Sequence, residues 1–159
     1  MYLRLASLPL LLLLFSFQPQ VDLFRKHYDA ATNYHRAGNY AAAEAEFKII
    51  LGEAYLRLGK IYSAQGNYQA SVGALESAAA ARSNSTDGLV ELSIAYFHTG
   101  QYAKGVEPLQ RVIKADAQNS TAHHMLGKTY FMMSEFEKAA RELEETLRLT
   151  PGDYDAEYT

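Results

Sequence analysis

The chain has 159 residues, of which 48% are hydrophobic, and its net charge at pH 7 is −3. This length and composition support one folded domain. The sequence contains no cysteine, which excludes disulfides, iron–sulfur clusters and thiolate zinc sites. Basic residues are interspersed with acidic ones instead of forming a basic stripe, so nucleic acid is not expected as a partner.

Residues 1–20 have the pattern of an export signal. Arg4 precedes an uninterrupted, largely apolar stretch that runs from Leu5 to Phe15. A membrane-spanning helix needs about 20 apolar residues, so this shorter stretch is typical of a secretory signal peptide. We therefore expect an exported protein, periplasmic or secreted, with residues 21–159 as its mature domain. Since no small-x-small cleavage motif precedes Val21, an uncleaved short membrane anchor and a buried first helix of the fold stay as alternatives.

One sequence motif recurs four times in the remaining chain. In each copy, a tyrosine lies four positions before a turn signal. The tyrosines are Tyr34, Tyr62, Tyr96 and Tyr130, and the turns begin at Gly38, Gly66, Gly100 and Ser134. The last two steps, from Tyr62 to Tyr96 and from Tyr96 to Tyr130, are equal, and each gives a period of 34. This period is a helix-turn-helix repeat length, so the sequence predicts a solenoid that functions through a surface rather than a catalytic pocket.

The segments between the turns have a helical pattern. Apolar residues recur at spacings of three and four, as in Leu126, Tyr130 and Met133, which places them on one helix face. No segment alternates with period two over a useful length, so no strand is expected.

Two Asn-Ser-Thr triplets, at Asn84 and Asn119, are glycosylation sequons only in a eukaryotic host. The overall character of the chain suggests a bacterial protein, and we interpret the triplets as helix N-caps.

Aligned on these tyrosines, the chain resembles the tetratricopeptide repeat family over roughly residues 22–159. Leu58-Gly59-x-x-Tyr62 and Leu126-Gly127-x-x-Tyr130 match the first-helix motif in full. The second helices carry a small residue and, four positions later, a large apolar one. These pairs are Ala43 and Phe47, Ser71 and Leu75, Gly105 and Leu109, and Ala139 and Leu143. The resemblance implies an all-α right-handed superhelix of about four repeats, at about 24–51, 52–85, 86–119 and 120–153, with the start of a further helix at 154–159.

The first step, from Tyr34 to Tyr62, is six positions shorter than the two that follow it. The second helix of the first repeat and the first helix of the next then overlap, and no loop fits between them. Gly52 is the only breaker, and a glycine inside a helix costs only about 1 kcal/mol relative to alanine. We predict one long helix from about Ala41 to Ala64, with a sharp bend at Gly52 as the alternative.

Residues able to support catalysis or metal binding are few. His123 and His124 are adjacent, so on a helix they point about 100° apart and cannot chelate one ion. His123 shares its register with His27, and we interpret it as a core or interface histidine. No nucleophile with a nearby base and no phosphate-binding glycine loop can be assembled, and Glu142, Glu144 and Glu145 fit a solvated helix face. We expect no enzyme activity, no cofactor and no metal.

In the family, the inner positions of each first helix line a concave peptide-binding groove. Carried over to this chain, they are Tyr28, Thr32, His35, Arg36, Leu56, Lys60, Ser63, Val90, Ile94, Phe97, His98, His124, Lys128, Phe131 and Met132. The polar clamp that some members use for a terminal carboxylate is not matched, because Val90 and Ile94 are apolar. We expect an apolar and aromatic groove with Lys60 and Lys128 as isolated positive points, although Phe97 and Phe131 could instead pack against neighbouring helices.

The sequence predicts a non-catalytic scaffold or assembly adaptor that binds a peptide or helical segment of another protein in this groove. The alternative is the repeat arm of a larger exported enzyme or regulator whose active domain follows residue 159, because the chain stops where a further helix starts. No membrane insertion is expected beyond the N-terminal segment. The partner and the oligomeric state are not predicted.

Overall fold

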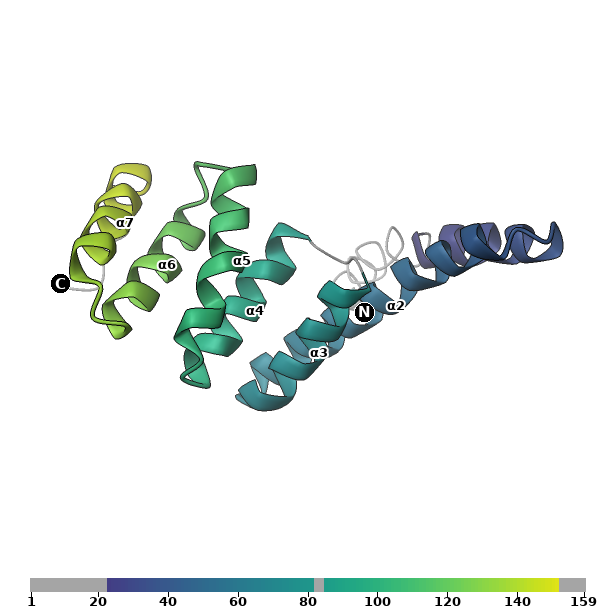
Figure 1. The fold of residues 1–159 in the computed structure, drawn as a ribbon, viewed down its shortest axis with the longest axis horizontal. Coiled ribbons are helices and arrows are strands. Elements are labelled where there is room, and N and C mark those ends of the chain that lie inside the picture. The colour runs from purple at the N-terminus through teal and green to yellow at the C-terminus, as the bar shows by residue number, and fades with distance from the viewer. Residues whose placement is uncertain (1–22, 82–84, 152–159) are drawn as a thin grey trace, which may run out of the picture. The chain divides into compact units, whose positions relative to one another are not determined.

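The structure, a computed structural model, describes residues 23–81 and 85–151, and these residues form helices joined by short turns (Figure 1). Residues 23–36 are helical. The helices that follow are α2 (Tyr40–Ala64), α3 (Tyr68–Ala80), α4 (Thr86–His98), α5 (Tyr102–Ala115), α6 (Ser120–Met132) and α7 (Phe136–Leu149). No strand occurs in these ranges, and the predicted all-α repeat fold is confirmed. The predicted signal at 1–20 and the helix start at 154–159 lie outside the described residues.

The helix predicted across the short step is present. α2 runs as one helix of 25 residues from Tyr40 to Ala64, with Gly52 inside it, which agrees with the fused form and not with a reversal of direction. The chain divides into two compact units, one ending at Leu51 and the other beginning at Gly52. Each is described by itself below.

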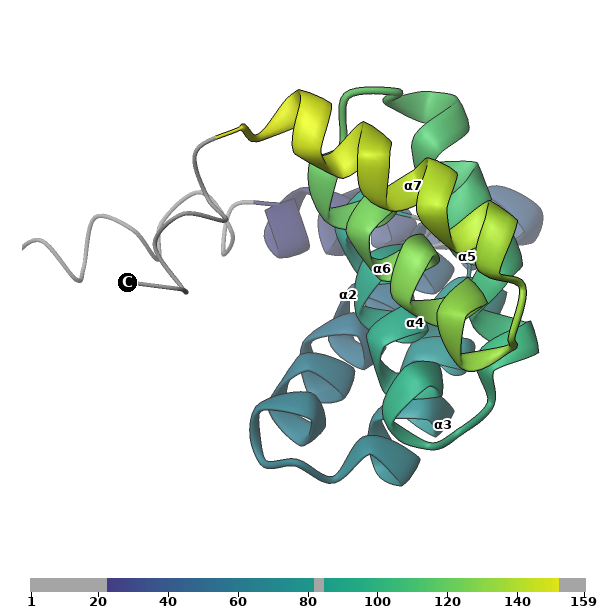
Figure 2. The same ribbon diagram turned by 90° about the vertical axis from the view of Figure 1, so that its left-hand side faces the viewer.

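In the second unit, helices pack in the order of the chain. α3 packs against α4, α4 against α5, α5 against α6 and α6 against α7, and α4 also contacts α6 (Figure 1). Figure 2 looks onto α7, the last helix of this stack. Two clusters of buried apolar side chains form the core. One includes Leu56, Leu75 and Leu92, and the other includes Leu109 and Leu126.

Small residues allow the two helices of each pair to approach closely. In the second unit these residues are Gly59 with Ser71, Ser93 with Gly105, and Gly127 with Ala139. The Ser71 hydroxyl donates to the Gly59 carbonyl at 2.9 Å, and the Ser93 hydroxyl donates to the Gly105 carbonyl at 3.1 Å. The glycine lies on the first helix of one pair, α2, and on the second helix of the next pair, α5, with serine on the opposite helix each time. The hydrogen bond between the two helices is kept in both pairs.

Helix ends follow the capping rules. The side chains of Asn67, Ser85 and Asn119 each accept a hydrogen bond from the backbone N–H three positions later, at the starts of α3, α4 and α6. The capping interpretation of the Asn-Ser-Thr triplets is therefore confirmed at Ser85 in the first triplet and at Asn119 in the second, whereas Asn84 is outside the described residues. At the turns, Gly100 has φ +73° and Ser134, at the equivalent position, has φ +62°, a conformation that glycine adopts without steric cost.

The first unit is a helical hairpin made by residues 23–36 and the start of α2. Ala31 and Ala43 are buried between the two helices. The rings of Tyr28 and Phe47 meet edge to face at 6.3 Å, and His27 Nδ1 lies 2.6 Å from Glu46 Oε2. No helix among the described residues is both long and apolar enough to cross a bilayer.

Candidate peptide-binding surface

The structure sorts the predicted groove residues by depth. Leu56 and Val90 are buried in the core of the second unit. They support the surface from beneath and offer little area to a ligand. Ile94 is half-buried against the same core, and His124 is half-buried on α6. The exposed or partly exposed members at the helix ends are His98, Lys128, Phe131 and Met132. The register identified these positions, but only tertiary packing determined which of them solvent reaches.

An aromatic and cationic cluster forms where α4 ends. The rings of Tyr68 and His98 stack with centroids 4.0 Å apart, and Phe97 meets His98 edge to face at 5.8 Å. Lys128 Nζ, from α6, lies 5.5 Å from the centroid of Phe97. This contact places a positive charge on the ring face, where a cation is attracted to the aromatic quadrupole. Three of the predicted groove residues, Phe97, His98 and Lys128, are therefore brought together.

One prediction about charge is wrong. Lys60 was expected to be an isolated positive point, but its ammonium group forms an ion pair with the carboxylate of Asp87 at the start of α4. The two residues are 27 positions apart, and no local pattern links them. Lys128, by contrast, makes no ion pair within the described residues, and its ammonium group lies over the ring of Phe97. The positive charge of this face is therefore concentrated at Lys128.

Two hollows lie beside these residues. One, of about 400 Å³, is lined by residues 100–104 together with Met132 and Met133. The other, of about 270 Å³, is lined by Thr86, Asp87, Val90, Asn119 and Thr121, near the starts of α4 and α6. Among the lining residues, Met132 and Val90 belong to the predicted groove. Thr86, Asp87 and Thr121 could have been found, since they lie three or four positions before predicted groove residues on the same helices.

An aromatic contact recurs within three of the helix pairs. The ring after the repeated tyrosine meets the ring at the start of the next helix edge to face. The pairs are His35 and Tyr40 at 5.5 Å, Phe97 and Tyr102 at 5.4 Å, and Phe131 and Phe136 at 5.6 Å. The packing alternative for Phe97 and Phe131 is thus correct in part. Phe97 is half-buried by its contacts, whereas Phe131 remains 58% exposed and can still meet a ligand.

In the first unit, the predicted groove positions lie on the helix at 23–36. Tyr28 is exposed. Thr32 is half-buried, and its hydroxyl donates to the Tyr28 carbonyl at 2.5 Å. His35 and Arg36 are exposed, and Ser63, on α2 in the second unit, is half-buried.

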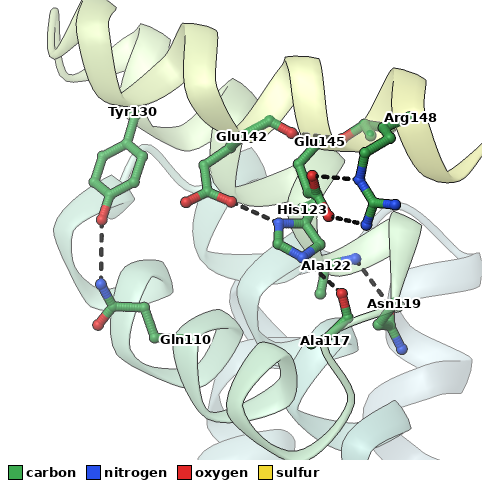
Figure 3. A network of polar contacts seen from close by, with 10 residues as sticks. Gln110, Ala117, Asn119, Ala122, His123, Tyr130, Glu142, Glu145 and Arg148 are labelled. Carbon is green, nitrogen blue, oxygen red and sulfur yellow. Dashed lines mark hydrogen bonds and ion pairs between the residues drawn. The ribbon is translucent and has the colours of Figure 1, made fainter.

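His123 is a packing residue, as its register suggested. Figure 3 shows its ring between α7 and the loop before α6, with Nδ1 2.6 Å from Glu142 Oε2 and Nε2 3.3 Å from the Ala117 carbonyl oxygen. Both ring nitrogens are therefore occupied inside the protein. Nearby, Gln110 Nε2 donates to the Tyr130 hydroxyl at 3.2 Å (Figure 3). Within the described ranges, no three His, Asp or Glu side chains are placed to hold a metal ion.

Comparisons with known proteins give a family match and a set of similar folds. Residues 56–120 match the family described as tetratricopeptide repeat. No curated protein matches the chain. Among solved structures, the first TPR of Spaghetti (RPAP3) bound to the HSP90 peptide SRMEEVD is 18% identical, covers 68% of this chain and 86% of its own, and has a TM-score of 0.62.

Two structures of MamA are also similar. A crystal structure of MamA is 25% identical, covers 79% of this chain and 77% of its own, and has a TM-score of 0.62. MamA from Desulfovibrio magneticus RS-1 is 19% identical, with coverages of 82% and 77% and a TM-score of 0.61. These similarities show that the chain has a tetratricopeptide-type helical repeat fold.

Proposed function

We propose that the chain is a non-catalytic interaction module that binds a peptide or helical segment of another protein across α4 and α6. The observation that carries the proposal is the exposed apolar surface made by Phe131 and Met132 on α6, beside the hollow of about 400 Å³. Exposed aromatic side chains next to a concavity are typical anchoring points of protein interfaces. The RPAP3 domain of the same fold holds a peptide of HSP90, which supports a peptide as the class of ligand.

The chemistry of this surface favours an apolar ligand that carries one acidic residue. Phe131 and Met132 offer apolar contact, and Lys128 offers a positive charge without a carboxylate partner in the described part of the chain. The ion pair with Asp87 leaves Lys60 less able to bind a second acidic residue. We therefore expect the acidic residue of the ligand to lie near Phe97 and Lys128, with apolar side chains directed to Phe131 and Met132.

The proposal is tested by capturing partners on the purified chain and on variants of it. Phe131→Ala removes the exposed aromatic ring, and Ile94→Asp places a charge beneath the surface. The matched control is Leu147→Ala, because Leu147 is similarly exposed, at 48%, but lies on α7 away from the predicted groove. We expect captured proteins to be lost from both surface variants and retained by the control. Circular dichroism checks that the helices survive.

Replacing Phe131 by the photoreactive residue benzoylphenylalanine would identify the bound segment directly, since the cross-linked peptide can be sequenced by mass spectrometry. Capture that is unchanged in both Phe131→Ala and Ile94→Asp would assign recognition to another face and overturn the proposal.

A further inference from the structure

Two equivalent places in the second unit differ in what fills them. Where α3 begins, the ring of Tyr68 stacks on the ring of His98 from the end of α4, with centroids 4.0 Å apart and an angle of 12° between the planes. One repeat later, 34 positions on, the corresponding residues are Tyr102 at the start of α5 and Met132 at the end of α6. Both of them line the hollow of about 400 Å³, which we call the turn hollow. A ring pair in one repeat therefore corresponds to a hollow in the next.

The ring of Tyr102 is held in place beside the turn hollow. Phe97 meets it edge to face at 5.4 Å, and Tyr102 is half-buried. The position that corresponds to Phe97 in the earlier repeat is Ser63, which has no ring to make this contact. A group that is already fixed loses little conformational freedom when a ligand packs on it. Tyr102 is thus a preorganised surface for the stacking of a second ring.

The other side chains of the turn hollow suit an uncharged ring. Met132 and Met133 line it, and Met132 is 46% exposed. A thioether is flexible and polarisable, and its sulfur makes favourable contacts with the edge of an aromatic ring at about 5 Å. Lys104 lines the same hollow, so its positive charge disfavours a protonated histidine as the ligand. The volume of the hollow lies within the range of about 300–1,000 Å³ that is typical of ligand pockets.

We propose that the turn hollow receives a Trp, Tyr or Phe side chain of the bound partner, which stacks on Tyr102 as His98 stacks on Tyr68. This inference rests on the interaction function proposed above and adds the chemical class of one ligand residue. Phe131 directly precedes Met132 and is 58% exposed, so a segment anchored in the turn hollow also reaches the apolar surface on α6. Stacked aromatic pairs contribute more than the area that they bury, and the aromatic residue therefore anchors the segment.

A small aromatic probe tests the turn hollow directly. The full chain, labelled with carbon-13 at the methionine methyl groups, is titrated with N-acetyltryptophanamide, and N-acetylleucinamide serves as the apolar probe without a ring. The chain has four methionines, so single Met→Leu variants assign every resonance. We expect the ring current of the bound indole to shift the resonances of Met132 and Met133 in a saturable manner and to leave that of Met125 in place, because Met125 does not line the hollow. Equal shifts with both probes, or no saturable shift, would overturn the proposal.

Variants at two positions test the equivalence of the two places. Met132→His should rebuild the ring pair of the earlier repeat, fill the turn hollow and abolish the shift of Met133 by the probe. Met132→Leu is the matched control, because it adds no ring and should keep probe binding. Tyr102→Leu removes the stacking surface and should weaken probe binding by about 2- to 10-fold. Circular dichroism confirms the helices of each variant. If Met132→His bound the probe as tightly as Met132→Leu, the proposal would be wrong.

Partner capture separates this inference from the proposed function. We expect capture to be lost from Met132→His and kept by Met132→Leu. Capture that is lost from Phe131→Ala but kept by Met132→His would leave the interaction function intact and refute the aromatic anchor. Probe binding to the native chain without any captured protein would instead count against the proposed function, and with it against a partner as the source of the ring.

The chain also has tyrosines of its own at Tyr154 and Tyr158, outside the described residues. The double variant Tyr154→Ala, Tyr158→Ala is titrated with the same probe. We expect its affinity for N-acetyltryptophanamide to equal that of the native chain. Tighter binding by this variant would show that the chain's own C-terminal residues compete for the turn hollow, and it would contradict the assignment to a partner.

Discussion

Replacing Gly59 by alanine tests the close approach of α2 and α3. A Cβ atom at Gly59 would lie 2.5 Å from Cγ and 2.6 Å from Cδ2 of Leu75, closer than carbon atoms pack. Leu75 is itself fully buried and shares a core cluster with Leu56 and Leu92, so it cannot move aside freely. Overpacking of a core costs about 1–3 kcal/mol, and a contact this short belongs at the upper end of that range.

The helix propensity of alanine offsets part of this cost. Alanine is favoured over glycine by about 1 kcal/mol inside a helix, so Gly59→Ala should lower the free energy of unfolding by about 2 kcal/mol net. For a domain of this size, we expect the midpoint of thermal unfolding to fall by about 4–8 °C.

The matched control is Gly73→Ala on α3. Nothing lies within 4 Å of a Cβ atom built at Gly73. The propensity gain then acts alone, and the unfolding free energy should rise by about 1 kcal/mol. Thermal and urea unfolding followed by circular dichroism measure both variants. If Gly59→Ala were as stable as the native protein while Gly73→Ala gained stability, the close approach would not limit the packing of these helices.

The turns, a buried phenol and the N-terminal segment allow three further tests. Ser134 has a left-handed backbone conformation, which costs a non-glycine residue about 1–2 kcal/mol. Ser134→Gly should therefore raise the free energy of unfolding by about 1 kcal/mol, and Gly100→Ser should lower it by about the same amount. Urea unfolding measures both variants. Burial and the hydrogen bond to Glu76 raise the pKa of Tyr96, so the folded state holds this proton more tightly than the unfolded chain. The free energy of unfolding should therefore decrease as the pH rises above about 10, the ordinary tyrosine pKa. If the free energy of unfolding of a Tyr96→Phe variant decreased as steeply with pH, this reasoning would be contradicted. If residues 1–20 are an export signal, intact-mass measurement of the chain from an exporting host should show their loss; recovery of the uncut chain from the cytosol would disprove it.

Much of the fold could be predicted because local spacing determines it. The turn at Gly100, the close approach at Gly59 and the continuous α2 all follow from residue type at a fixed register, and the structure contains each of them. The register also placed His123 in the packed interior, where it lies against Glu142.

The character of the groove could be predicted only in part. The register gives the side of the helix on which Lys60 lies but not the carboxylate that meets it, because Asp87 belongs to another helix. Similarly, Leu56 and Val90 occupy the repeat position of the exposed Tyr28, yet neighbouring helices bury them. Whether a side chain at such a position is available to a ligand depends on packing between helices, which a single sequence does not specify.

The order of contacts in the second unit has a consequence for its folding. α3 to α7 contact mainly their neighbours in the chain, so few contacts require distant segments to meet. Chains with local contacts fold quickly, and in helical repeats order can begin at any adjacent pair and spread. α7 has only α6 as a packed neighbour among the described helices. Its backbone amides should therefore exchange with solvent deuterium sooner than those of α4 and α5, and the solenoid should open from this end before it unfolds as a whole.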